Sequence, residues 1–130
     1  MIEVKKNAPP TAVEMQNFMK EIDFPLSPEF VDFFSTANGA DVFTGERYIF
    51  LWPITEMKKN NDDYEVPELA PEFFLIGHNG GDGAYGIEKK SGKVYQLPFL
   101  ELSDDLELVS DSFQDFIYGT QLEENSGDAV

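Results

Sequence analysis

Residues 73–97, FFLIGHNGGDGAYGIEKKSGKVYQL, decide the fold class of this chain. They contain three short runs of apolar, aromatic and β-branched residues, separated by loops rich in glycine and polar side chains, which is typical of consecutive β-strands. Glycine supplies the positive φ angles that such tight loops need. Consecutive strands joined by short loops pair in antiparallel fashion. The predicted strands are Phe73–Gly77, Ala84–Glu88 and Lys93–Leu97, joined by loops 78–83 and 89–92.

Another hairpin is predicted upstream, from Asp41–Thr44 and Tyr48–Trp52 around the loop Gly45-Glu46-Arg47. Aromatic and β-branched residues alternate in both runs, and a proline stops the second run. Alternate side chains of a strand point to opposite faces. Tyr48, Phe50 and Trp52 are therefore expected on one face; Phe50 is assigned to the core, whereas Trp52 is left open between the core and a binding surface.

Two amphipathic helices precede these strands, after a short extended lead. Thr11 and Glu14 have the spacing of a capping box, and Ser27-Pro28 has the pattern of a second helix start, with Asn38-Gly39 as its end. Each helix repeats apolar residues at helical spacing. These residues are Met15, Phe18, Met19 and Ile22 in the first helix, and Phe30, Phe33, Phe34 and Ala37 in the second.

The rest of the chain adds little regular structure. Residues 55–61 are expected to form one or two helical turns, and a short final helix is expected to open at Ser110 or Asp111. Helices first, then a run of strands, then a helix indicate an α+β fold with a largely antiparallel sheet, or a mixed one. We expect a single domain over residues 1–120 and an acidic flexible tail over residues 121–130.

Composition excludes several classes of function. Against 25 Asp and Glu there are nine Lys and Arg, a net charge of −16, which argues against binding to nucleic acids or anionic membranes. The chain has no cysteine, so disulfides, thiolate catalysis and cysteine-based zinc sites are excluded. No apolar run approaches the roughly 20 residues of a spanning helix, and no signal-peptide core stands at the N-terminus. A cytoplasmic location is expected.

No catalytic, cofactor or metal site is predicted. The glycine-rich stretch 77–86 lacks the Lys-Ser/Thr of a phosphate loop, and a strand rather than a helix follows it. Asn79, Asp82 and Glu88 lack the spacing of a calcium loop, although weak adventitious cation binding there stays open. His78, the single histidine, is interpreted as a turn residue bonded to backbone. An enzyme acting on a cationic or metal-bound substrate would have to use Asp82, Glu88 and His78.

Charge is distributed unevenly, because no basic residue follows Lys93. Such a surface promotes solubility, and it also attracts a basic partner through a field that salt screens over about 8 Å. If one strand face is open, Tyr48 and Trp52 would anchor binding there, since aromatic rings add contact area at little entropic cost. The predicted partner-binding residues are Asp41, Glu46, Tyr48, Trp52, Asp82, Asp104 and Asp105.

Three stretches of the chain resemble the SUKH superfamily. The segment 24–30, FPLSPEF, with Asn38-Gly39 is similar to its first signature, and 74–77, FLIG, with the glycine loop and 92–95, GKVY, is similar to its second. Residues 112–117, SFQDFI, are similar to its last helix. The resemblance covers about residues 11–118; Phe24, where leucine is usual, and Glu88, where aspartate is common, depart from the pattern but keep residue class.

This resemblance implies an α+β domain without enzymatic activity. Bacterial members commonly are immunity proteins that bind and neutralise polymorphic toxins, often nucleases or deaminases, whereas fungal members are scaffolding regulators of cell-wall synthesis. A bare domain is closer to the bacterial type. We therefore expect an immunity protein for a basic toxin, with a regulatory adaptor for an endogenous protein as the alternative. The family has no shared contact set to carry over, and the oligomeric state stays open.

Overall fold

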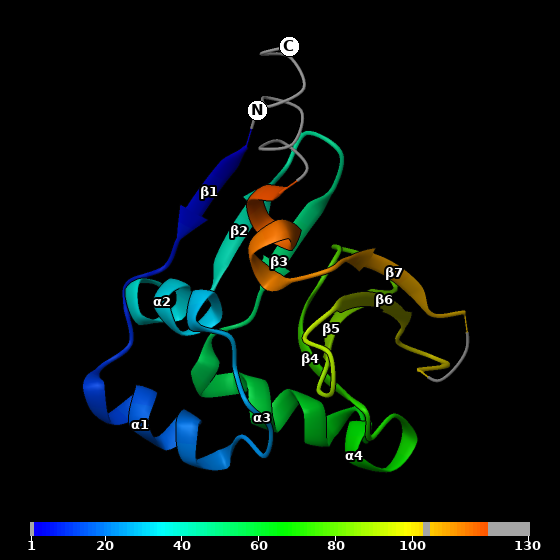
Figure 1. Cartoon of the computed structure of the whole chain (residues 1–130), viewed down its shortest axis with the longest axis horizontal. Coiled ribbons are helices and arrows are strands. Elements are labelled where there is room, and N and C mark those ends of the chain that lie inside the picture. Colours follow the sequence, from blue (N-terminus) through cyan, green and yellow to red (C-terminus); the bar gives the residue numbers. More distant parts are fainter. Residues whose placement is uncertain (1, 103–104, 120–130) are drawn as a thin grey trace.

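The computed structural model describes residues 2–102 and 105–119. Within these residues the strands form one sheet in chain order, and each pairs antiparallel with the next (Figure 1). The predicted α+β class and antiparallel sheet are confirmed; the predicted tail, 121–130, lies outside the described residues. The strands are β1 (Glu3–Lys6), β2 (Ala40–Phe43), β3 (Tyr48–Leu51), β4 (Phe73–His78), β5 (Gly83–Glu88), β6 (Val94–Pro98) and β7 (Glu107–Ser110).

The first two helices begin where capping residues predict. Thr11 accepts the Glu14 backbone N–H through its hydroxyl at 3.1 Å, and the Glu14 carboxylate accepts the Thr11 N–H at 2.8 Å. Ser27 likewise caps the second helix by accepting the Phe30 N–H at 3.2 Å. No helix among the described residues has the length and apolarity to cross a bilayer. The helices are α1 (Ala12–Glu21), α2 (Pro28–Thr36), α3 (Ile54–Asp63), α4 (Val66–Leu69) and the π-helix η1 (Asp115–Gly119).

The main core lies between one sheet face and a layer made of α1, α2, η1 and the start of α3. Phenylalanine rings dominate it: Phe30 is fully buried and packs 6.1 Å from Phe18, 4.5 Å from Phe34 and 5.1 Å from Phe113, measured between ring centroids. The helical spacing of these side chains in the sequence therefore reflects their burial. This layer covers the inner face of β1–β3 as well as that of β4–β6.

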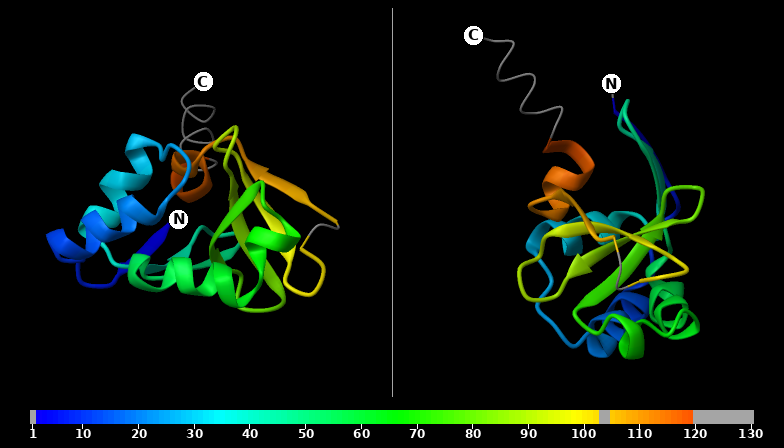
Figure 2. Two further views of the ribbon diagram at one scale, coloured as in Figure 1. Left: turned by 90° about the horizontal axis from the view of Figure 1, so that it is seen from below. Right: turned by 90° about the vertical axis from the view of Figure 1, so that its right-hand side faces the viewer.

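A second, smaller core covers only part of the opposite sheet face. Phe73 and Leu75 of β4 point into it, whereas their neighbours Phe74 and Ile76 point into the main core. α4 and the segment after β6 supply its cover, through Val66, Ala70 and Leu102. This cover stops at β4, and the right-hand view of Figure 2 shows β1–β3 with α2 and η1 on one side and no helix on the other.

Asn61 joins the helical layer to the sheet. It is a buried polar residue, 3% exposed. Its Oδ1 accepts the backbone N–H of Leu75 at 2.8 Å, and its Nδ2 donates to the carbonyl oxygens of Leu75 at 2.9 Å and Met57 at 2.8 Å. β3 pairs with β4 only at Phe50–His78 and Leu51–Gly77. The Asn61 amide thus takes the place of a neighbouring strand at Leu75.

Several boundaries differ from the sequence predictions. α3 has ten residues rather than one or two turns, and neither α4 nor β7 was predicted. The final helix does not open at Ser110 or Asp111, because Ser110 ends β7 and the Ser112 hydroxyl accepts the Asp115 N–H at 3.0 Å. These elements depend on tertiary contacts: the polar α3 is held through Met57 and Asn61, and β7 adds to the edge of β6.

Replacing Asn61 tests its bridging role. Asn61→Ala leaves the Leu75 N–H and C=O buried without partners, and each such group costs about 1–3 kcal/mol. We expect the free energy of unfolding, measured by urea titration, to fall by at least about 2 kcal/mol. The matched control is Asn60→Ala at the half-exposed neighbour on the same helix, with an expected change of about 0.5 kcal/mol or less. Equal effects of the two variants would contradict the bridge.

Gly77 has no room for a side chain, because a Cβ there would overlap the carbonyl oxygen of Phe50 on β3. Gly77→Ala is therefore expected to push β3 away from β4 and to lower the free energy of unfolding by about 1–3 kcal/mol. At Gly81 the nearest atom to a Cβ is 3.5 Å away and φ is not positive, so Gly81→Ala serves as the control. Thermal unfolding of both variants by circular dichroism measures the difference; equal stability would refute the close approach.

Candidate protein-binding surface

An unbroken row of aromatic rings crosses the outer face of the sheet. Tyr48 stacks between Phe43 and Phe50, with ring centroids 4.6 Å and 6.1 Å away, and Phe50 stacks on His78 at 5.2 Å. The row continues from His78 to Trp52 at 6.2 Å. It then extends beyond the sheet, as Tyr64 lies 6.4 Å from Trp52 and 4.6 Å from Phe99. We call these seven residues the aromatic row: Phe43, Tyr48, Phe50, His78, Trp52, Tyr64 and Phe99.

Strand register places the first part of this row. Phe43 lies opposite Tyr48 across the β2–β3 hairpin, and Phe50 lies opposite Asp41 on one side and His78 on the other. All of these side chains share the outer face, because Ile49 and Leu51 point into the main core. The Tyr85 hydroxyl donates to the backbone carbonyl of Tyr48 at 3.4 Å and so ties the hairpin to β5.

The row is accessible at several points, unlike the phenylalanine core. Tyr48 is 56% exposed and Tyr64 is 42% exposed, while Phe43, Phe50 and Trp52 are half-buried. Tyr and Trp are enriched at protein interfaces because they offer large, rigid contact area together with a polar tip. A row of half-exposed rings on an uncovered sheet face therefore has the composition of an interface core.

A hollow of about 240 Å³ lies at the hairpin end of the row. It is lined by Phe43, Tyr48 and Phe50 of the row and by five residues of β1 and β2, namely Glu3, Val4, Lys5, Asp41 and Val42. β1 runs beside β2 with Lys5 opposite Asp41 and Glu3 opposite Phe43. The hollow thus combines aromatic faces with two carboxylates and one ammonium group.

His78 lies in the middle of the row. Its Nδ1 accepts the Gly80 N–H at 3.0 Å, which places the proton of the neutral ring on Nε2. Burial lowers the pKa of His78 below its ordinary value of 6.5, and the Asp41 carboxylate opposes this shift. The ring is therefore a neutral, stacked member of the surface near pH 7. The predicted bond of His78 to the backbone is confirmed, but its predicted place in a turn is wrong, because His78 is the last residue of β4 and pairs with both Phe50 and Ala84. Its stacking on Phe50 was not predicted.

The structure brings only part of the predicted contact set together. Asp41, Tyr48 and Trp52 all belong to the outer face, and Glu46 is exposed in the turn of the same hairpin. Asp82 is exposed in the turn after β4, and its backbone carbonyl accepts the Phe99 N–H at 2.9 Å.

Asp105 of that set does not belong to the hairpin. It is exposed in the connection between β6 and β7. Asp104 lies outside the described residues.

The assignment of Phe50 to the core is wrong. Its side chain is half-buried on the outer face, where it lines the hollow and stacks between Tyr48 and His78. Alternation placed Phe50 correctly on the face of Tyr48, but it could not tell which face the helices cover. Trp52, left open, lies at the border and packs against both cores.

His78 and Glu88, two of the residues that the enzyme hypothesis required, do not lie together. Glu88 pairs with Phe73 at one end of the β4–β5 ladder, whereas His78 pairs with Ala84 at the other. At about 3.3 Å per residue along a strand, Glu88 lies more than 10 Å from His78. Within the described ranges no three His, Asp or Glu side chains are grouped so that they could hold a metal ion.

The predicted contact set omitted five members of the row: Phe43, Phe50, His78, Tyr64 and Phe99. The strand pairing of the predicted hairpin could have revealed two of them. Phe43 lies opposite Tyr48, and Phe50 lies two residues after Tyr48 on the same strand face. Tyr64 and Phe99 carry no such signal, because α3 and the end of β6 bring them beside Trp52 only in the folded chain.

The fold and this surface describe an α+β domain with an open, aromatic sheet face. A family model described as SMI1 / KNR4 family (SUKH-1) matches residues 9–119, and the chain belongs to this family. The family comprises immunity and regulatory domains, which bind protein partners and are generally non-catalytic. No curated protein matches the chain at a significant level.

The pKa of His78 tests the partial burial of its ring within the row. Because His78 is the single histidine, its ring signals can be followed alone by NMR during a pH titration. We expect a midpoint below 6.5, and a lower one still in Asp41→Asn, which removes the opposing carboxylate. The unfolded chain then binds the proton more readily, so the free energy of unfolding decreases as the pH falls below 6.5. A midpoint at or above 6.5 would contradict burial of the ring.

Proposed function

We propose that this chain is an immunity protein that binds and neutralises a basic polymorphic toxin, such as a nuclease or a deaminase. The observation that carries the proposal is the aromatic row on a sheet face that no helix within residues 2–102 and 105–119 covers. Membership of a family of immunity and regulatory domains that bind proteins supports it.

Charge supports a basic partner. The net charge of −16 gives the molecule a negative field that accelerates association with a positively charged surface. Toxins that act on nucleic acids need basic active sites to bind phosphates. An acidic domain that covers such a site competes directly with the substrate, and this inhibition requires no catalytic residue.

Binding energy and binding rate then come from different residues. The half-buried and exposed rings, Tyr48 above all, provide desolvated contact area, which holds the complex together once formed. Acidic side chains around them, such as Asp41 and Glu46, steer the approach of the partner and set the salt dependence. Both kinds of residue lie on the β2–β3 hairpin.

Co-expression with the toxin encoded next to this gene tests the proposal. We expect the chain to protect cells from that toxin and to bind it with an affinity that falls as salt rises, measured by calorimetry. Tyr48→Ala is expected to weaken binding at least about tenfold, the size of a hot-spot effect. Asp41→Asn is expected mainly to slow association and to flatten the salt dependence.

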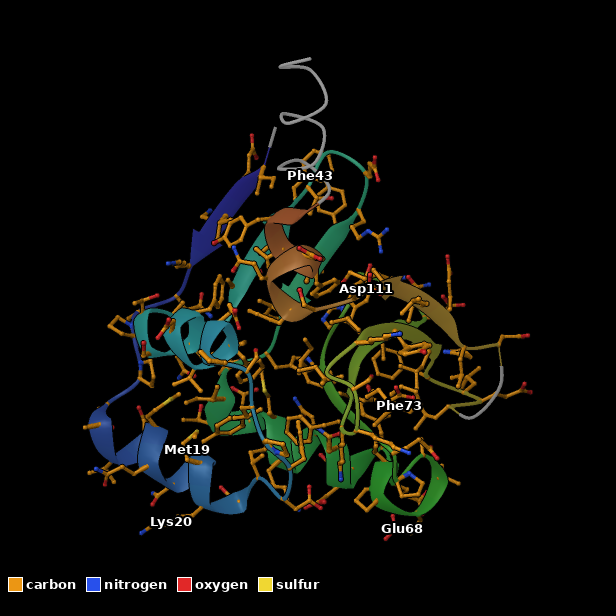
Figure 3. The ribbon with its side chains drawn as sticks, viewed as in Figure 1. Met19, Lys20, Phe43, Glu68, Phe73 and Asp111 are labelled. Atoms are coloured by element: carbon orange, nitrogen blue, oxygen red, sulfur yellow. The ribbon has the colours of Figure 1, made fainter. Side chains whose placement is uncertain are left out.

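Met19→Ala provides the matched control, because Met19 is a large exposed apolar residue, 44% exposed, on a different surface. Figure 3 shows Met19 on α1 at the opposite end of the molecule from Phe43. Its replacement should change the affinity less than twofold. If the chain neither protects cells from the toxin nor binds it, the immunity function is refuted. Association with endogenous proteins that does not depend on salt would instead favour the regulatory adaptor.

A further inference from the structure

The hollow between β1 and β3 has the size of a single side chain. Pockets for small organic ligands measure roughly 300–1,000 Å³, whereas this hollow measures about 240 Å³ and is open to solvent. Its floor and walls come from three neighbouring strands whose register is fixed by backbone pairing. A partner can therefore insert one residue here without any rearrangement of the sheet.

The chemistry of the hollow selects a planar cation. The rings of Tyr48 and Phe50 are nearly parallel, with 11° between their planes, and both line the hollow together with Asp41, which lies opposite Phe50 in the β2–β3 register. Guanidinium groups stack on aromatic rings and bind carboxylates through two parallel N–H bonds. A lysine ammonium is a more strongly hydrated point charge and lacks the planar fork.

We propose that this hollow receives one arginine side chain of the protein partner, packed against the exposed parts of the Tyr48 and Phe50 rings and paired with Asp41. This inference rests on the proposed function only in that the partner is a basic protein; the ligand chemistry of the hollow stands by itself. A second copy of this chain is a poor occupant, since two molecules of charge −16 repel each other and each carries a single arginine.

Lys5 limits the affinity of the hollow. It lines the hollow and lies opposite Asp41 in the β1–β2 register, so its ammonium group opposes an incoming guanidinium and competes for the same carboxylate. Removing its charge should therefore strengthen arginine binding, whereas neutralising Asp41 should weaken it. The two substitutions are expected to change the affinity for arginine in opposite directions. Loss of folding would lower that affinity in both variants.

NMR titration of the full chain with N-acetyl-arginine amide at low salt tests the proposal. We expect saturable shifts at the backbone amides of Asp41, Tyr48 and Phe50, with binding at least about threefold tighter than for N-acetyl-lysine amide. N-acetyl-citrulline amide, which keeps the shape without the charge, should bind more weakly still. Asp41→Asn should weaken the arginine probe about threefold or more, and Lys5→Ala should strengthen it.

Three results would overturn the proposal: equal binding of the lysine and arginine probes, shifts spread over the acidic surface instead of the hollow, or no response of the affinity to Asp41→Asn and Lys5→Ala. The titration uses no toxin, so its failure leaves the immunity function to be judged by co-expression. Conversely, a failure of protection leaves the arginine site measurable.

Discussion

The amide of Asn61 is the contact on which the arrangement of the two layers depends. It satisfies both backbone groups of Leu75 and so takes the place of a neighbouring strand where β3 has already turned away from β4. A buried backbone group without a partner is costly, so the divergence of β3 and β4 needs this side chain. The same divergence lets α3 enter at the edge of β4 and carry Tyr64 toward Trp52.

Coverage of the sheet is asymmetric as a result. The helices cover the inner face along its length, while the outer face is covered only at the β4–β6 end by α4 and the segment after β6. Among the residues that the structure describes, no helix or strand covers the outer face of β1–β3, and aromatic rings line it there. The same strands thus bury Ile49 on the inner face and leave Tyr48 exposed on the outer face.

The elements that the sequence predicted are those with local causes. Helix caps, apolar residues at helical spacing and glycine loops all act over a few residues. α1 and α2 begin after the predicted caps, Thr11 and Ser27. Elements with distant causes were missed or misplaced. α3 is polar, and its own residue Asn61 holds it to Leu75 of β4. β7 forms by pairing with the edge of β6. The local sequence preferences of α3 and β7 do not reveal either of these contacts.

The same division holds for the candidate surface. Sequence alone determined the acidic charge, the absence of cysteine chemistry and the placement of Tyr48, Phe50 and Trp52 on one strand face, because charge and strand alternation are properties of the chain itself. Only the tertiary structure decided that this face is open, that His78 joins it and that Asp41 lies beside Phe50. The reason is physical: which of two apolar faces is buried depends on where the helices pack, and that is settled by contacts between residues far apart in the sequence.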